Sequence, residues 1–150
     1  MNSMKEAAVV TDPGADRISH RHRLRRLVGT GFIATLAAAA ATTLAATLAR
    51  AAGADFEVQG GETIRLSGIA VVTGFFSAVG IVIAAALLRL SARPAERFVW
   101  TAMSLTAISL IPPLLSGATT ATTTALLGLH LVPAAVMIPT LARSLGPRAD

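Results

Sequence analysis

Three long stretches of the chain carry no charged side chain. They are residues 27–49, 66–88 and 98–142, which contain no Asp, Glu, Lys or Arg. A helix needs about 20 residues to cross a hydrocarbon core of about 30 Å, so the first two stretches each predict one crossing. The third would form a helix of about 68 Å, and Pro112 and Pro113 break it near its middle. It therefore predicts two crossings.

The pattern predicts an all-α protein, an integral membrane four-helix bundle. The expected spans are residues 27–49, 66–88, 98–115 and 120–142. They lie in a transmembrane domain of residues 24–145, between a disordered basic cytoplasmic tail (residues 1–23) and a second cytoplasmic tail (residues 146–150). A hydroxyl at Thr119 or Thr120 is expected to cap the last span.

The connection between the first two spans shows a weak alternation of polar and apolar residues. Phe56 and Val58 alternate with polar neighbours, as do Ile64 and Leu66, and two glycines stand between the pairs. This pattern predicts a short β-hairpin in the outer loop, whose apolar side chains rest on helix ends. An irregular loop is the alternative.

Small residues recur at every fourth position in both of these spans. The rows are Thr30, Ala34, Ala38, Thr42 and Ala46 in the first span, and Ala70, Gly74 and Ala78 in the second. Rows of this kind let helix backbones approach closely in lipid. We expect both rows to face other helices.

Composition and charge agree with a membrane protein and set its orientation. Apolar residues make up 53% of the chain and charged residues 14%, where soluble domains carry about 25% charged residues. Eleven of the 13 Lys and Arg residues lie in the tails and in the turn at residues 89–97, and only Arg50 and Arg65 lie on the other side. The positive-inside rule then predicts a multi-pass plasma-membrane protein with cytoplasmic N- and C-termini.

A basic cluster precedes the first span. Its arginines are Arg21, Arg23, Arg25 and Arg26. Retention on the cytoplasmic side explains the cluster most simply, and the same side chains could contact anionic lipid head groups. Because the positive charges flank apolar segments, no nucleic-acid partner is expected.

A secretory signal is the alternative for the first span. Basic residues precede this span, and Ala52 and Ala54 stand in the spacing of a cleavage site. The apolar stretch is longer than such signals usually are, and the rest of the chain is itself apolar, so a retained span is favoured.

Motifs of soluble enzymes are absent from the sequence. There is no phosphate-binding glycine loop, no paired catalytic carboxylates and no cysteine. We therefore expect no enzymatic activity, catalytic residue, cofactor or bound metal.

Only one histidine, His130, lies within a predicted span, near mid-membrane. An ionisable group at that depth is a candidate functional site. Thr106 and Ser109 lie at a similar depth on the preceding span. We expect a neutral His130 to bond one of these hydroxyls across the helix interface, which would make the group structural.

The sequence thus favours a membrane protein with a structural or accessory role. Such a role implies a homo-oligomer or another membrane protein as partner, besides the lipid bilayer. The alternative is a small transporter or channel-like subunit that uses His130 and the backbone carbonyls freed by the prolines.

The last third of the chain resembles a family of small actinobacterial four-span membrane proteins, known only as a domain of unknown function. The resemblance covers residues 24–145 and rests on a motif at Ser109, Leu110, Pro113, Thr119, Thr120, His130, Leu131, Pro139 and Arg143. It implies a four-span architecture in the plasma membrane and brings no activity with it.

Overall fold

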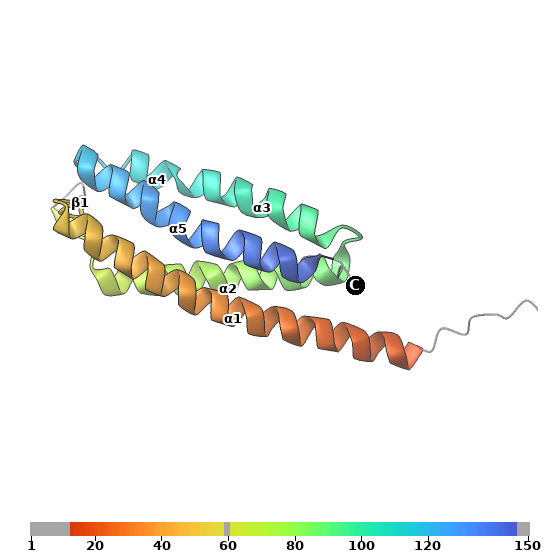
Figure 1. The fold of residues 1–150 in the computed structure, drawn as a ribbon. Helices are drawn as coiled ribbons and strands as arrows, with labels where there is room; N and C mark the ends of the chain where they lie inside the picture. Colours follow the sequence, from red (N-terminus) through yellow and green to blue (C-terminus); the bar gives the residue numbers. More distant parts are fainter. Residues whose placement is uncertain (1–12, 59–60, 147–150) are drawn as a thin grey trace, which may run out of the picture.

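The computed structural model describes residues 13–58 and 61–146, although not the side chains of residues 13–17, 58 and 62. Long helices packed side by side form nearly all of it (Figure 1). The elements are α1 (Pro13–Ala51), β1 (Glu57–Val58), β2 (Glu62–Thr63), α2 (Leu66–Leu90), α3 (Pro94–Ser109), α4 (Ile111–Leu114) and α5 (Thr120–Leu145).

Three helices are long and apolar enough to cross a membrane. They are residues Ile18–Ala51 of α1, all of α2 and all of α5. Their positions agree with the predicted first, second and fourth spans. Thr119 accepts a hydrogen bond from the amide of Thr122, so the predicted cap of the last span is confirmed.

The predicted span at residues 98–115 is not one continuous helix. Its residues are divided between α3 and α4, which meet at Leu110. Pro112 and Pro113 lack the amide hydrogens that would bond the carbonyls of Ile108 and Ser109, and this loss breaks the regular pattern. The backbone stays helical at Leu110 (φ −79°, ψ −15°), so the chain continues without reversing.

Helix α1 begins earlier than the sequence suggested. Residues 13–23 were assigned to a disordered tail, whereas the structure is helical from Pro13. Proline suits the first turn of a helix, and the Arg and Leu residues that follow are good helix formers, so the membrane helix extends at little cost. The extension projects beyond the ends of the other helices (Figure 1). Residues 1–12 lie outside the described part of the chain.

The outer loop contains a two-residue antiparallel ladder. Glu57 pairs with Thr63, and Val58 pairs with Glu62. The ladder is shorter than the predicted hairpin strands, and its turn includes residues 59–60, which the structure does not describe.

Buried side chains form two layers, of which the larger extends from one end of the molecule toward its middle and the smaller lies at the other end. One layer contains Leu27, Leu88, Phe98 and Leu145, which come from four different helices. An arginine adjoins three of these residues in the sequence, so we call this end the arginine end. The second layer, at the loop end, contains Ala46, Ala54, Phe56, Leu126 and Leu129.

The small-residue row of α1 packs as expected. Ala34, Ala38, Thr42 and Ala46 are all buried. Gly31 extends the row, because a Cβ built there would lie 2.7 Å from Cγ1 of Ile81 on α2. The prediction of a close helix approach along this face is confirmed.

The row predicted for α2 packs only in part, because Ala70 and Gly74 are half-buried. Ala78 is exposed, and the helix instead buries Thr73, Ser77, Ala84 and Leu88. The centre of this buried face is turned by about 70° from the centre of the row, so Ala70 and Gly74 lie at its edge. The helix turns the hydroxyls of Thr73 and Ser77 inward, where a membrane protein shields polar groups from lipid.

Large apolar side chains lie on the outside of the molecule. On α2 the exposed large apolar residues are Val71, Val72, Phe75, Phe76, Val79, Val82 and Leu90. The buried positions hold many small residues and hydroxyls, among them Thr42, Thr73, Ser77 and Thr122. Soluble monomers rarely expose apolar surface of this extent, so the distribution is that of a protein whose surroundings are lipid.

Candidate functional site

The loop end is the most elaborate polar arrangement in the described part of the chain. Phe56 is its centre: the side chain is fully buried among residues of α1 and α5. Ile64 and Leu66 pack against the same cluster, so the predicted contact of the loop with helix ends is confirmed for these three residues. Phe56 has φ 55°, a conformation that L-residues seldom adopt and that costs of the order of 1 kcal/mol or more. Burial of the ring offsets that cost.

Asp55 and Thr122 fasten the loop to the start of α5. The hydroxyl of Thr122 donates to Oδ1 of Asp55 at 2.5 Å and accepts from the amide of Phe56 at 3.3 Å. Oδ1 of Asp55 also accepts from the amide of Glu57 at 3.2 Å. Thr122 is fully buried, so this hydroxyl finds both of its partners in the loop rather than in water.

These hydrogen bonds lower the pKa of Asp55 below its ordinary value of 3.8. The hydroxyl of Thr122 is the largest cause, and the amide of Glu57 is the second. Both donors favour the charged carboxylate. Asp55 is therefore ionised wherever the loop is in place at neutral pH.

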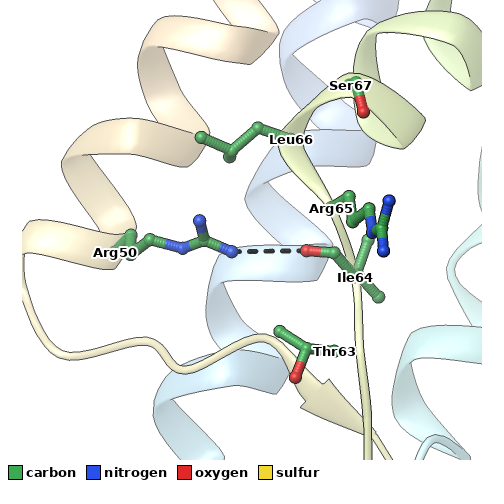
Figure 2. Close-up of a pocket in the computed structure, with 6 residues that line it drawn as sticks. All are labelled: Arg50, Thr63, Ile64, Arg65, Leu66 and Ser67. Atoms are coloured by element: carbon green, nitrogen blue, oxygen red, sulfur yellow. Dashed lines mark hydrogen bonds between the residues drawn. The ribbon is translucent and has the colours of Figure 1, made fainter.

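Arg50 closes the other side of the loop. Its guanidinium donates to the carbonyl of Ile64 at 3.3 Å and lies 5.6 Å from the centre of the Phe56 ring. The amide of Ile64 donates in turn to the carbonyl of Phe56 at 3.0 Å. Figure 2 shows Arg50 reaching from α1 to the segment that leads into α2. An open depression of about 740 Å³ lies here, with Arg65 and Ser67 also in its lining.

The chemistry of the loop end is that of a clamp. Its polar groups are engaged with one another across α1, the loop and α5, and Phe56 fills the space beneath them. The one hydroxyl that contacts a carboxylate here, that of Thr122, is fully buried and also accepts from the amide of Phe56. Its evident effect is to hold the ends of α1, α2 and α5 at fixed positions.

His130 bonds to its own helix. Its Nδ1 lies 2.8 Å from the carbonyl oxygen of Leu126. Because a carbonyl only accepts, Nδ1 carries the proton, and in the neutral ring Nε2 is left as an acceptor. The side chain is half-buried.

Thr106 and Ser109 also bond within their own helix. Thr106 donates to the carbonyl of Ala102 at 2.8 Å, and Ser109 donates to the carbonyl of Thr106 at 2.7 Å. The expected bond from His130 to either hydroxyl is absent among the described residues. Serine and threonine in a helix readily satisfy their hydroxyls on the preceding turn, and that local bond has displaced the interhelical one.

The basic cluster lies on the projecting part of α1. Arg21, Arg23, Arg25 and Arg26 are all exposed. Within the described part of the chain, none of the four forms an ion pair or a side-chain hydrogen bond with another residue. Nor do the described residues include a group of three or more His, Cys, Asp or Glu side chains able to hold a metal ion.

Sequence reasoning missed Asp55, Thr122 and the clamping role of Arg50. Asp55 and Thr122 stand 67 positions apart, and each has an ordinary explanation as a loop acid or as one of several threonines at a helix start. One signal was available: the alternation of apolar residues predicted that Phe56 packs on the helix ends. The backbone of a buried loop residue needs hydrogen-bonding partners, so polar side chains were to be expected beside Phe56.

Comparison with known proteins gives one match. The model of a family described as "Family of unknown function (DUF6069)" matches residues 22–147. No curated protein matches the chain, and no solved structure does. The matched range begins within α1, one residue after Arg21, and extends past the end of α5, and the expected resemblance to a family of unknown function is confirmed.

Proposed function

Because the chain belongs to this family of unknown function, whose description carries no activity, we propose a role from its own structure. The protein is a plasma-membrane four-helix bundle with a structural or accessory role, and it is not an enzyme. The observation that carries this proposal is the extent of large apolar side chains on the outside of the molecule, together with hydroxyl-bearing residues among the buried ones. Such an apolar surface is expected where the protein contacts lipid.

A fourth crossing by α3 and α4 together completes the bundle. Phe98 near the start of α3 lies in the buried layer at the arginine end, with Leu27, Leu88 and Leu145. Helix α4 leads at the other end into α5, whose Thr122 bonds the outer loop. The two helices lie along α5 for most of its length (Figure 1). Residues 98–115 carry no charge and would span about 27 Å as a helix, close to the hydrocarbon thickness.

The distribution of charge supports a cytoplasmic arginine end. Arg26, Arg89 and Arg97 each adjoin a residue of the same buried layer, so they would lie at one membrane surface. Arg50 and Arg65 lie at the loop end. The positive-inside rule then favours an external loop end, with both termini inside.

The hydrogen bonds within the helices support a structural role over transport. Embedded hydroxyls donate to carbonyls of their own helix, as Thr42 does to Ala38 and Thr140 does to Val136. A transport path needs polar groups that face a shared space and are open to a substrate. An accessory protein needs only a stable apolar surface on which a second copy or another membrane protein can pack.

His130 supports the second candidate, a small transporter or channel-like subunit. Its half-buried ring stands in the apolar α5, and Nε2 has no partner within the described residues. A proton-coupled site would use this nitrogen.

Proton flux into reconstituted vesicles distinguishes the two candidates. Purified protein is placed in vesicles that contain a pH-sensitive dye, and a pH gradient is applied. We expect flux no greater than in protein-free vesicles, both for the unchanged protein and for His130→Gln. His22→Gln, at an exposed position on the projecting part of α1, is the matched control. Flux that His130→Gln abolishes and His22→Gln preserves, with both variants folded, would replace the structural role by the transporter.

A further inference from the structure

The projecting part of α1 fixes the heights of the four arginines. Leu27 is 1% exposed and belongs to the layer that ends the packed helices. At about 1.5 Å per residue, Arg26 lies about 2 Å beyond Leu27 along the helix axis, and Arg21 lies about 9 Å beyond it. The head-group layer of a bilayer is about 5 to 8 Å thick on each side. The backbone positions of Arg23, Arg25 and Arg26 therefore fall within the head-group layer when Leu27 marks the edge of the hydrocarbon core, and Arg21 falls just beyond it. Their long side chains can reach lipid phosphates from these heights.

The arginines are also distributed around the helix. Successive residues turn by about 100°, so Arg21 and Arg25 lie on one side, while Arg26 and Arg23 continue around the circumference. This arrangement gives no single concave pocket. It suits several separate lipids around the helix, each with a phosphate in reach of one guanidinium.

We propose that Arg21, Arg23, Arg25 and Arg26 form a lipid-binding collar that recruits anionic phospholipids from the leaflet at the arginine end. One guanidinium group can donate two parallel hydrogen bonds to the oxygens of one phosphate. Each Lys or Arg near an anionic membrane surface contributes about 1 kcal/mol to the attraction between protein and membrane. Because the collar is helical and continuous with a membrane helix, it lies at the membrane surface at all times. The collar therefore meets lipid phosphates at a higher local concentration than phosphate ions from solution. This inference adds a partner to the proposed membrane role and does not depend on whether α3 and α4 cross.

Electron spin resonance of spin-labelled lipids tests the collar. The full chain is reconstituted in phosphatidylcholine, and the association of spin-labelled phosphatidylglycerol with the protein is compared with that of spin-labelled phosphatidylcholine. We expect the anionic lipid to be preferred about threefold or more at low salt. Exposed charges are screened by salt, so the preference should shrink markedly in about 1 M NaCl.

Two variants, each changed at all four arginines, test whether the preference for anionic lipid comes from the collar. Arg→Gln at the four positions removes the charges and should lower the preference by at least about half. Arg→Lys at the same positions keeps the charges and should retain most of it. Arg65→Gln, at the loop end, is a control that should change little. Thermal unfolding of each variant in neutral detergent checks that it is folded. A preference that is absent in the unchanged protein, or that survives the Gln replacement in a folded variant, would overturn the proposal.

Discussion

Small side chains decide where the helices can approach one another. Gly31 lies where α1 meets both α2 and α5: a Cβ there would be 2.7 Å from Cγ1 of Ile81 and 3.3 Å from Cδ2 of Leu141. Gly29 stands two residues earlier in the same helix, with nothing within 4 Å of a Cβ added there. The two glycines therefore lie in the same helix, and only Gly31 is packed against neighbouring helices.

Replacing the two glycines in turn tests this contact. Gly31→Ala forces Ile81 to shift and should lower the free energy of unfolding by about 1–3 kcal/mol, as overpacking usually does. Gly29→Ala should leave it unchanged or slightly raised, because alanine favours helix. Thermal unfolding in neutral detergent measures both. Equal effects of the two substitutions would show that α1 does not approach α2 in this register.

Another single residue, Asp55, links the loop to α5, because its carboxylate accepts a hydrogen bond from Thr122. Its lowered pKa means that the native state binds a proton less readily than the unfolded chain does. The stabilisation is thus fully present above pH 3.8, the ordinary value, and is lost as the pH falls through the lower folded pKa.

Asp55→Asn should therefore lower the thermal stability at pH 7, and by a similar margin at pH 5. The difference from the unchanged protein should shrink below pH 3.8, as its own Asp55 becomes protonated. Glu57→Gln serves as the control, because it also removes one negative charge, at an exposed position two residues after Asp55. A margin that stays constant down to pH 2 would mean that the charge of Asp55 has no part in the clamp.

At the scale of whole elements, each helix presents one face inward. On α2 the inward face carries Thr73 and Ser77, and the outward face carries Phe75, Phe76 and Ala78. Neighbouring residues at 77 and 78 thus experience opposite surroundings, one packed by protein and one open to lipid.

Leucine at each of these two positions tests the rotation of α2. Ser77→Leu places a large side chain in the packed interface and should destabilise the protein by about 1–3 kcal/mol. Ala78→Leu adds an apolar side chain on the lipid side and should be nearly neutral. Unfolding in detergent by heat or denaturant compares them. If Ala78→Leu proved the more damaging, the row of Ala70, Gly74 and Ala78 would be the packed face after all.

The elements differ in how far the sequence alone could predict them. Long uncharged stretches defined α1, α2 and α5, because a membrane helix must be apolar for its whole length. The rotation of α2 could not be predicted from spacing, since two small-residue rows exist and only tertiary packing selects between them. Equally, no local pattern joins Asp55 to Thr122, since their bond forms only after three helices have packed. His130 was located correctly on α5, but the choice of its own helix as partner depends on rotamers that spacing does not fix.

For the molecule as a whole, the central claim is that it crosses the membrane four times. Three helices meet the requirements of length and apolarity, and the crossing by α3 and α4 depends on their position between the two ends of the molecule. The number of crossings also decides the side on which α5 begins. Four crossings put the start of α5 on the side of the outer loop, and three would put it on the side of residues 91–93.

Labelling of single cysteines on intact cells measures this directly. The natural chain has no cysteine, so each variant carries one reactive thiol. Ala52 and Ala92 are exposed positions in two of the connections, and Thr120 is the exposed first residue of α5. With a membrane-impermeant maleimide, Ala52→Cys and Thr120→Cys should be labelled from outside, and Ala92→Cys only after the cells are permeabilised. If Thr120→Cys is protected together with Ala92→Cys while Ala52→Cys is labelled, α3 and α4 do not cross, and the four-span account is contradicted.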